Sequence, residues 1–377
     1  MHDSEPRRDR TGRSMTAAST QPEAIDRELV DFAVVTRWMD DQDLPSGPLR
    51  DIEVLAGGTQ NVLVRFTRGR QAYVLRRGPR HLRRSSNEVI GREARVLHAL
   101  AGTDVPHPRY VAGPADESLI GATFYLMEPV DGFNPASGLP DLHAGDERIR
   151  HVLGLEVAGA AARLGAVDHV AVGLADFGRP DGFLERQVPR WLGELDSYGE
   201  LDGYPGPDIP GLEAVAAWLD DNRPRNWRPG IMHGDYHLAN VMIRYDGPHV
   251  AAIVDWEMCT IGDPLLDLGL LLATWPLGPG GPGGDDATAA AAAGAIGAAG
   301  GLPTPDELVA RYADESDRDV STIDWYTAMA CFKLGIVLEG THARACAGKA
   351  LQATGDLLHA ITLGLFARAQ TVIARGG

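Results

Sequence analysis

A short polar stretch in the second half of the chain carries the residues best suited to chemistry. The sequence H-G-D-Y-H-L-A-N begins at His233, and the sequence I-V-D-W-E begins at Ile253. Two carboxylates and an amide, on Asp235, Asp255 and Asn240, meet the needs of magnesium-dependent phosphoryl transfer, in which one group accepts a hydroxyl proton and oxygen ligands hold Mg²⁺ against nucleotide phosphates. We expect Asp235 to be the catalytic base, and Asn240 and Asp255 to bind the metal.

Two short apolar runs would position these polar residues. Residues 241–243 and 250–254 are strand-like, and the sequence D-G-P at 246–248 indicates a turn between them. The two strands would form a hairpin in which Asn240 precedes the first strand and Asp255 follows the second. The hairpin therefore predicts that the polar groups converge at one end.

These residues carry a family resemblance. The pattern H-G-D-x-x-x-x-N, then I-V-D-W-E, then D-P-x-x-D-L from Asp263, resembles the aminoglycoside phosphotransferase superfamily, whose members share the two-lobed protein-kinase-like fold. Kinases carry H-R-D-x-x-x-x-N and D-F-G at the matching places. Residues 176–187 and 254–264 narrow the resemblance to bacterial stand-alone phosphotransferases and to the kinase domain fused to some acyl-CoA dehydrogenases. It covers roughly residues 26–375.

Two other interpretations of the polar stretch are weaker. His233 and His237 are four residues apart, which on a helix would suit zinc, but Gly234 opposes a helix and the Glu of H-E-x-x-H is missing. Either aspartate alone could simply cap a turn, but both occur together with Asn240 at the kinase spacing. By resemblance, His233 is structural and braces the loop.

The resemblance implies an α+β fold with two lobes. A small antiparallel-sheet N-lobe would occupy residues 26–128, and a larger, mostly helical C-lobe would occupy residues 129–377. Residues 1–25 are polar and rich in arginine, without an apolar core, and are predicted to form a disordered tail. A helix is predicted at residues 24–39. Strands are predicted at residues 52–56, 61–66 and 71–77.

The turn between the first two strands contains Gly57, Gly58 and Thr59. A glycine-rich hairpin of this kind lets backbone N–H groups approach nucleotide phosphates, as the kinase glycine-rich loop does. Most Gly-Gly hairpins are only turns, so this prediction depends on the downstream motif.

The third strand carries Arg76 where the kinase pattern has a lysine that pairs with a helix glutamate. Guanidinium also binds phosphate and carboxylate, with a different reach. Glu93 is the predicted partner, and Glu88 is the alternative. By resemblance, the backbone around Glu128 and Val130 would hydrogen-bond adenine.

Composition narrows the function classes. A formal net charge of −17 argues against a nucleic-acid-binding surface. The three cysteines show no metal-binding spacing, and we find neither a signal-peptide pattern nor a run of 18 apolar residues, so we expect a cytoplasmic protein without a membrane span. Residues 65–95 contain ten arginines against two glutamates, which would suit additional phosphates such as those of CoA, or simply a solvated surface.

The C-lobe is predicted to be helical at residues 146–167, 182–195, 212–222, 264–274, 323–345 and 349–374. By resemblance, residues 176–187 form part of the acceptor site, where Arg186, Arg190 and Trp191 would bind an anionic or flat acceptor or merely pack the helices. Residues 276–305 are rich in Gly, Ala and Pro and are predicted to form a mobile insertion near the acceptor.

Together these features predict a kinase that uses ATP and Mg²⁺ to phosphorylate a hydroxyl of a small molecule. A hydroxyacyl-CoA is the first acceptor class, and an aminoglycoside is the alternative. A third interpretation is a regulatory pseudokinase that binds nucleotide, for which the departure at Arg76 is the best support. The sequence does not determine the oligomeric state.

Overall fold

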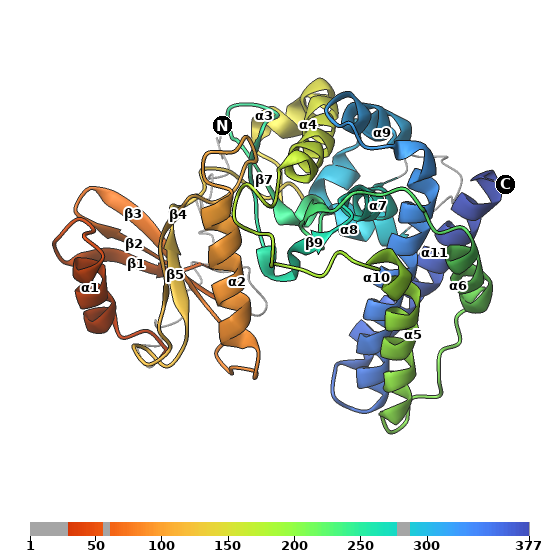
Figure 1. Cartoon of the computed structure of the whole chain (residues 1–377), viewed down its shortest axis with the longest axis horizontal. Coiled ribbons are helices and arrows are strands. Elements are labelled where there is room, and N and C mark those ends of the chain that lie inside the picture. The colour runs from red at the N-terminus through yellow and green to blue at the C-terminus, as the bar shows by residue number, and fades with distance from the viewer. Residues whose placement is uncertain (1–28, 56–60, 277–286, 377) are drawn as a thin grey trace, which may run out of the picture.

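The computed structural model describes residues 29–55, 61–276 and 287–376. It confirms a two-lobed, kinase-like α+β fold, with an N-terminal sheet on one side and a mostly helical lobe on the other (Figure 1). The predicted tail at residues 1–25 and the turn residues Gly57, Gly58 and Thr59 lie outside the described residues.

The N-lobe contains a five-stranded antiparallel sheet in the order β1-β2-β3-β5-β4. Its strands are β1 (Leu49–Val54), β2 (Val62–Arg68), β3 (Gln71–Arg77), β4 (Tyr110–Ala115) and β5 (Phe124–Met127). Strand β3 is central, so its apolar run from Tyr73 to Leu75 is buried, whereas the edge strand β1 is mostly exposed. The strand predicted at residues 71–77 coincides with β3.

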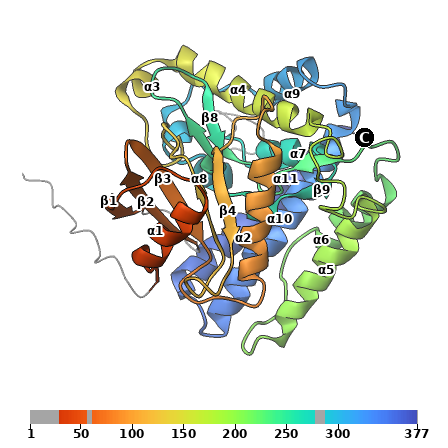
Figure 2. The ribbon, with the colours of Figure 1, turned by 60° about the vertical axis from the view of Figure 1, so that its left-hand side comes forward.

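Two helices cover this sheet on different sides (Figures 1 and 2). Helix α1 (Phe32–Asp41) packs Val35 and Met39 with the core residues of β2 and β3. Helix α2 (Ser86–Ala99) faces the C-lobe, and its Ile90 and Leu97 belong to the hydrophobic core of that lobe. Because α2 is shared in this way, it couples the sheet to the catalytic lobe.

The predicted start of the first helix was too early. Residues 29–31 are not helical, and α1 begins at Phe32 because the Asp31 carboxylate accepts hydrogen bonds from the N–H groups of Ala33 and Val34. An N-cap of this kind satisfies two backbone donors that have no partner inside the helix. Residues 24–28 of that prediction lie outside the described part of the chain.

The C-lobe is built mainly of helices. They are α3 (Asp141–Gly145), α4 (Glu147–Ala166), α5 (Gln187–Ser197), α6 (Leu212–Asp221), α7 (Leu265–Ala273), α8 (Ala287–Ala299), α9 (Pro305–Asp314), α10 (Ile323–Cys346) and α11 (Gln352–Gly376), with short 3₁₀ turns η1 (Leu184–Arg186), η2 (Tyr198–Glu200), η3 (Leu238–Asn240), η4 (Trp256–Met258) and η5 (Val320–Thr322). The helix predicted at residues 182–195 begins only at Gln187, since η1 and a turn precede it.

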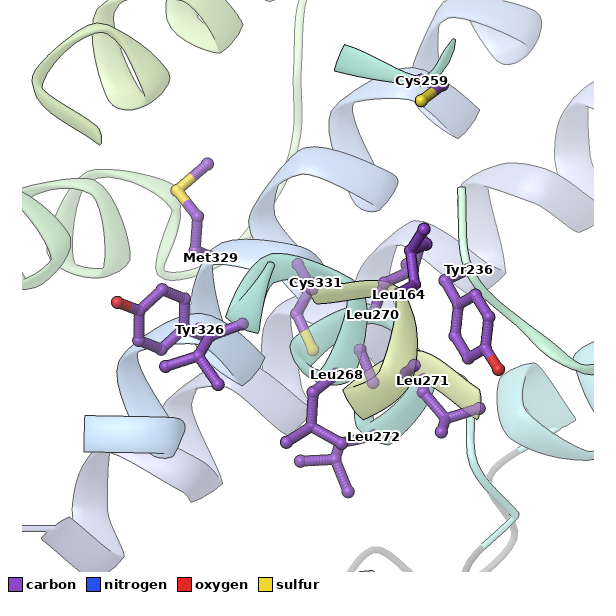
Figure 3. Close-up of a cluster of buried hydrophobic side chains, with 14 of the residues drawn as sticks. Leu164, Tyr236, Cys259, Leu268, Leu270, Leu271, Leu272, Tyr326, Met329 and Cys331 are labelled. Atoms are coloured by element: carbon purple, nitrogen blue, oxygen red, sulfur yellow. The ribbon is translucent and has the colours of Figure 1, made fainter. Parts of the chain in front are cut away.

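Helix α7 lies at the centre of this lobe, and Figure 3 shows its leucines among the buried side chains. The helix has apolar residues all round, as expected of a helix buried on every side. An added Cβ at Gly269 would lie 2.5 Å from the carbonyl oxygen of Tyr326. Glycine therefore allows α7 to approach α10 closely, and this contact fixes the helix that supports the catalytic loop.

Two small antiparallel two-stranded sheets flank the catalytic stretch. They are formed by β6 (Gly230–Met232) with β9 (Thr260–Gly262), and by β7 (Val241–Ile243) with β8 (Val250–Ile253). The second is the hairpin that the sequence predicted. Residues 233–240, which we call the catalytic loop, connect β6 to β7.

Part of the Gly, Ala and Pro-rich segment is helical. Residues 277–286 lie outside the described residues, and α8 follows with a kink at Gly294. The N–H groups of Ala295 and Ile296 donate to the carbonyls of Ala136 and Pro135 at 2.9 and 3.1 Å. This end of α8 is therefore anchored to the C-lobe, and the mobility expected of the segment stays a prediction.

Among the described residues, α11 is the one helix long and apolar enough to cross a membrane by length and composition, over Gln352–Arg375. Its residues Leu365, Phe366 and Ala369 are buried in the C-lobe core. Core helices of soluble proteins meet the same criteria, so a single helix of this kind is weak evidence of a membrane span.

Candidate active site

The structure brings Asp235 and Asn240 together within the catalytic loop. The Asn240 amide nitrogen Nδ2 donates to the backbone carbonyl of Asp235 at 2.9 Å and to its carboxylate oxygen Oδ2 at 3.0 Å. The amide oxygen of Asn240 is thereby turned away from Asp235. The five-residue spacing read from the sequence therefore corresponds to direct contact.

Asp255 reaches the same end of the hairpin from the other strand. The N–H of Val254 donates to the carbonyl of Asn240 at 2.9 Å, which places Asp255 immediately beyond this contact. Asp255 has a φ of +67°, a left-handed conformation that costs energy for a residue with a side chain. Such strain often marks a functional position, and the Asp255 side chain is 43% exposed.

Two distant helices hold the start of the catalytic loop. The Asp267 carboxylate on α7 accepts hydrogen bonds from the N–H groups of His233 and Gly234 at 2.6 and 2.8 Å. The Lys333 ammonium on α10 donates to the Gly234 carbonyl at 2.7 Å. Asp267 is the second aspartate of the motif D-P-x-x-D-L that begins at Asp263, whereas no sequence motif revealed Lys333. The one sequence feature that could have drawn attention to Lys333 is the rarity of lysine, since Lys333 and Lys349 are the two lysines of an arginine-rich chain.

Gly234 itself allows this arrangement. Its φ is +84°, and an added Cβ would lie 2.4 Å from the carbonyl oxygen of Met258. A side chain at this position would therefore both strain the backbone and clash with the neighbouring segment.

His233 braces the loop from inside, as the resemblance implied. Its ring nitrogen Nε2 donates to the carbonyl of Val254 at 3.0 Å, and Nδ1 accepts from the N–H of Asp235 at 3.3 Å. These two bonds fit the neutral imidazole. Complete burial lowers the pKa of His233 to about 4, although the neighbouring Asp235 carboxylate opposes this shift. His233 is therefore a structural residue that stays neutral.

Asp235 is held in its ionised form. Burial by itself would raise its pKa, but the hydrogen bond and charge of His237, together with the charge of Lys333, lower the pKa below the ordinary value of 3.8. The His237 nitrogen Nε2 lies 3.4 Å from the carboxylate oxygen Oδ2. An ionised carboxylate in this position is ready to accept a hydrogen bond from a hydroxyl group.

Arg76 forms the predicted ion pair and one further contact. Its guanidinium binds Glu93 through two hydrogen bonds, at 2.6 and 2.8 Å, and it also binds Asp255 at 2.9 Å. The Tyr125 hydroxyl donates to Glu93 at 3.1 Å. Glu88, the alternative partner, is exposed on the same helix. Arg76 therefore connects α2 of the N-lobe to the predicted metal ligand Asp255, a contact that the sequence did not predict.

The residues near Asp255 fit a magnesium ion. Asn240 offers an amide oxygen and Asp255 a carboxylate, and one carboxylate oxygen from each of Glu93, Asp255 and Glu257 lies within 4.8 Å of the others. Hard oxygen ligands of this kind suit Mg²⁺. Burial, then the charge of Asp255, raises the pKa of Glu257, as expected where carboxylates gather. Glu257 was quoted in the sequence motif but not proposed as a ligand.

One of the backbone groups expected to contact adenine already has a hydrogen-bond partner within the protein. The N–H of Glu128, just beyond β5, donates to the carbonyl of Arg109 at 2.8 Å. This N–H is therefore engaged, which leaves the carbonyl of Glu128 and the N–H of Val130 as the backbone groups for a base.

A cleft of about 550 Å³ lies between α2 and the segment 176–190, with Thr260 of β9 in its wall. We call it the arginine pocket, because its lining includes Arg92, Arg179, Arg186 and Arg190. Its one acidic lining residue, Asp176, forms an ion pair with Arg95 outside the lining.

Two of these arginines are held by carbonyl groups. Arg92 donates to the carbonyls of Phe177 and Cys259 at 2.9 and 3.3 Å, and Arg186 donates to the carbonyl of Arg179 at 2.6 Å. A carbonyl satisfies a hydrogen bond but does not neutralise the guanidinium charge. The pocket is therefore positive, in a chain that is acidic as a whole.

The arginine pocket adjoins the catalytic loop. The Arg190 guanidinium lies 4.9 Å from the centre of the Trp191 ring, and the Lys333 ammonium lies 5.7 Å from the same ring. Lys333 in turn contacts Gly234. Thr260 in the pocket wall pairs with Met232, which immediately precedes the loop. An acceptor bound in the pocket would thus lie next to the loop that carries Asp235.

Comparison with known families decides the class of the protein. A family model described as the phosphotransferase enzyme family matches residues 51–308, which is more than half of the chain. The chain belongs to this family. As a member of the phosphotransferase family, it is a small-molecule kinase whose acceptor is an alcohol group.

Curated relatives of this phosphotransferase include acyl-CoA dehydrogenase family member 11 of Gallus gallus, 29% identical over 81% of the chain, and family member 10 of Mus musculus, 28% identical over 75%. The chain spans only 38% and 25% of the lengths of these two proteins. Their names fit the predicted resemblance to a kinase domain fused to acyl-CoA dehydrogenases.

Among solved structures, a candidate aminoglycoside phosphotransferase from Ralstonia eutropha is 29% identical, with a TM-score of 0.71 over 90% of this chain and 98% of that one. A GDP complex of aminoglycoside 2′-phosphotransferase-IIIa shares the fold, with a TM-score of 0.56 at 15% identity over 91% and 99% of the two chains.

Proposed function

We propose that the protein transfers the γ-phosphoryl group of ATP, with Mg²⁺, to a hydroxyl group of an anionic metabolite of the hydroxyacyl-CoA class. The observation that carries the proposal is the convergence of Asp235, Asn240 and Asp255 beside a pocket of positive charge. The nucleotide with its metal and the acceptor alcohol would then bind on neighbouring sides of the catalytic loop.

Each residue of the catalytic loop has a distinct role in this proposal. Asp235 accepts a hydrogen bond from the acceptor hydroxyl and takes its proton as the new oxygen–phosphorus bond forms and the bond to the leaving ADP breaks. Its lowered pKa implies that it mainly orients the hydroxyl and receives the proton late. Asn240 and Asp255 would hold Mg²⁺, which supplies charge neutralisation on the phosphates.

Arg76 would replace the kinase lysine in contacting the donor phosphates. Its bidentate bond to Glu93 reproduces the ion pair that active kinases need. This observation favours an active enzyme over the pseudokinase alternative. Gly57, Gly58 and Thr59 would approach the same phosphates through their backbone N–H groups.

The charge of the arginine pocket favours an anionic acceptor over a cationic aminoglycoside. The partners of Arg92 and Arg186 are carbonyls, which do not neutralise a positive charge, while Asp176 is already paired with Arg95. The phosphates of CoA would bind such guanidinium groups through charge-assisted hydrogen bonds. The names of the curated relatives point to the same acyl-CoA chemistry.

We further propose a cytoplasmic location, which rests on the cysteines. Cys259 and Cys346 are free thiols in the structure, and Cys259 is buried. Free thiols are typical of a reducing compartment.

The decisive experiment measures ADP release with ATP and Mg²⁺ against a hydroxyacyl-CoA, the corresponding free hydroxy acid and an aminoglycoside. We expect release with the thioester, and a loss of about 10²- to 10⁴-fold in kcat for Asp235→Asn, the usual contribution of a positioned base. ADP release with the aminoglycoside alone would show that the acceptor is an aminoglycoside and not a hydroxyacyl-CoA. Release that is independent of both acceptor and Asp235 would refute the proposed mechanism.

A further inference from the structure

A second group of metal-ligating side chains lies where α10 turns into α11, away from the catalytic loop (Figure 1). Glu339 and His342 lie on α10, and His359 lies on α11. Each offers one ligand atom, and these three atoms lie within 4.8 Å of one another. Since α10 rises about 1.5 Å per residue, Glu339 is roughly 9 Å along the helix from Lys333 at the catalytic loop.

The sequence spacing explains the convergence. The run E-G-T-H ends at His342 and the run D-L-L-H, from Asp356, ends at His359, so each antiparallel helix presents an acidic residue and a histidine three positions apart. Residues with this spacing lie on one face of a helix. Paired motifs of this type on facing helices build metal sites in helical bundles.

Glu339 is prepared to act as a ligand. Its side chain is completely buried, the Tyr204 hydroxyl donates to Oε1 at 2.8 Å, and His359 Nδ1 lies 2.8 Å from Oε2. The tyrosine therefore orients one carboxylate oxygen and leaves the other facing the imidazoles. Metal-binding carboxylates are commonly held by an outer hydrogen bond of this kind.

One ring nitrogen of His342 is a second, independent observation that points to a ligand at this position. Its Nδ1 is a buried nitrogen without a hydrogen-bond partner, and the nearest Asp356 oxygen is 3.8 Å away. The His342 ring stacks on the His359 ring, with 4.5 Å between their centres. Neutral imidazoles are good metal ligands.

We propose that Glu339, His342 and His359 form a binding site for a divalent transition metal ion, specifically Zn²⁺, that links α10 to α11. Two imidazoles and one carboxylate are an established ligand set for zinc, and the nitrogen ligands disfavour the harder Mg²⁺. The Cys346 thiol lies 3.6 Å from the other ring nitrogen of His342, Nε2, so Nδ1 is the nitrogen left for the metal. The site is structural, and the proposal is independent of the catalytic function.

Calorimetric titration of the full chain with Zn²⁺ tests this site directly. The protein carries no affinity tag, is first stripped with a chelator, and is titrated in excess Mg²⁺ so that the oxygen ligands near Asp255 are saturated. We expect one tight zinc site per chain, which His342→Gln and His359→Gln each weaken by at least about 100-fold, and which Tyr204→Phe weakens by about 10-fold as an outer-shell change.

Two controls locate the ion. His151→Gln changes a histidine that contacts Glu307 on another surface, and Asp255→Asn changes the catalytic cluster, so both should retain the tight site. Circular dichroism reports whether each variant is folded. If both histidine variants fail to fold, the visible absorption spectrum of Co²⁺ bound to the wild-type protein is measured instead. A spectrum typical of tetrahedral Co²⁺, which disappears when one equivalent of Zn²⁺ displaces the Co²⁺, supports the site.

Three results would overturn the proposal. They are the lack of stoichiometric binding in the wild-type protein, an unchanged affinity in folded His342→Gln and His359→Gln variants, and loss of the tight site in Asp255→Asn. The second result would mean adventitious binding at other side chains, and the third would place the ion in the catalytic cluster.

Discussion

The catalytic loop and the arginine pocket adjoin each other but are held in different ways. The loop is fixed by groups far away in sequence, namely Asp267 on α7, Lys333 on α10 and the carbonyl of Val254. Two pocket arginines, Arg92 and Arg186, bond instead to carbonyls, mostly of the pocket's own segment. The catalytic loop is thus held by the core of the lobe, while the proposed acceptor pocket is held mostly by contacts within its own segment.

This difference separates two classes of expected effect. Changes to the supports of the loop should lower kcat or stability for every acceptor, since they displace Asp235. Changes to the pocket should raise KM for one acceptor class and leave kcat nearly constant. The lost contacts would have bound the substrate and the transition state equally.

Of the changes considered, protonation of His233 should most reduce the free energy of unfolding, because His233 supports the catalytic loop. Its pKa of about 4 in the folded protein lies below the ordinary 6.5, so the unfolded chain binds the proton more strongly between these values. The stability that depends on neutral His233 is therefore present above pH 6.5 and is lost as the pH falls toward 4. The full difference corresponds to about 3 kcal/mol.

Urea unfolding between pH 4 and pH 7 measures this contribution. The slope of unfolding free energy against pH should be smaller in His233→Gln than in the wild-type protein. His81→Gln, which changes an exposed histidine, should keep the wild-type slope. Equal slopes in the wild-type protein and His233→Gln would show that His233 does not remain neutral on folding.

Removal of the Lys333 ammonium should be the next largest effect. Lys333→Met keeps much of the side-chain length but deletes the bond to the Gly234 carbonyl and the positive charge near Asp235. A hydrogen bond to a charged group contributes about 2 kcal/mol, so kcat should fall roughly 30-fold. Lys349→Met, at an exposed position, is the matched control and should retain wild-type kcat.

The kinetic constants of Lys333→Met also sharpen the comparison. Steady-state measurement with two acceptors should give the same fold-loss in kcat for both. A variant with normal kcat and a raised KM for anionic acceptors alone would instead assign Lys333 to the pocket, whose Arg190 lies over the same Trp191 ring.

The sequence revealed the local part of this design. Asp235 and Asn240 lie five residues apart in one loop, and Asp255 follows a strand of the same hairpin, so spacing alone predicted their convergence. The ion pair of Arg76 with Glu93 was predicted from the resemblance to the kinase pattern, which places a basic residue on the third strand and its glutamate on the next helix. Such contacts depend on short stretches whose geometry is fixed by hydrogen-bonding pattern and residue type.

The contacts that escaped prediction join segments far apart in the chain. Lys333 is 99 positions from Gly234, and Arg76 is 179 positions from Asp255. Both contacts depend on how whole helices pack, and periodicity does not contain that information. The start of α1 was missed for a local reason, because the capping side chain of Asp31 outweighed the apolar pattern before it.

Removal of one pocket charge should have the smallest effect. Arg190 lines the pocket and lies over the Trp191 ring, so Arg190→Gln deletes a positive charge with little change in size. We expect KM for a hydroxyacyl-CoA to rise about 10-fold, equivalent to about 1.4 kcal/mol, with kcat within about twofold. The matched control is Arg223→Gln, which removes an arginine paired with Asp220 on another surface.

Ionic strength gives this prediction a second measurement. Added salt screens exposed charges, so it should raise KM more in the wild-type protein than in Arg190→Gln, and the two values should approach each other at high salt. If Arg190→Gln lowered kcat as strongly as Lys333→Met, the pocket and the catalytic loop would be one mechanical unit, and their separation would be wrong.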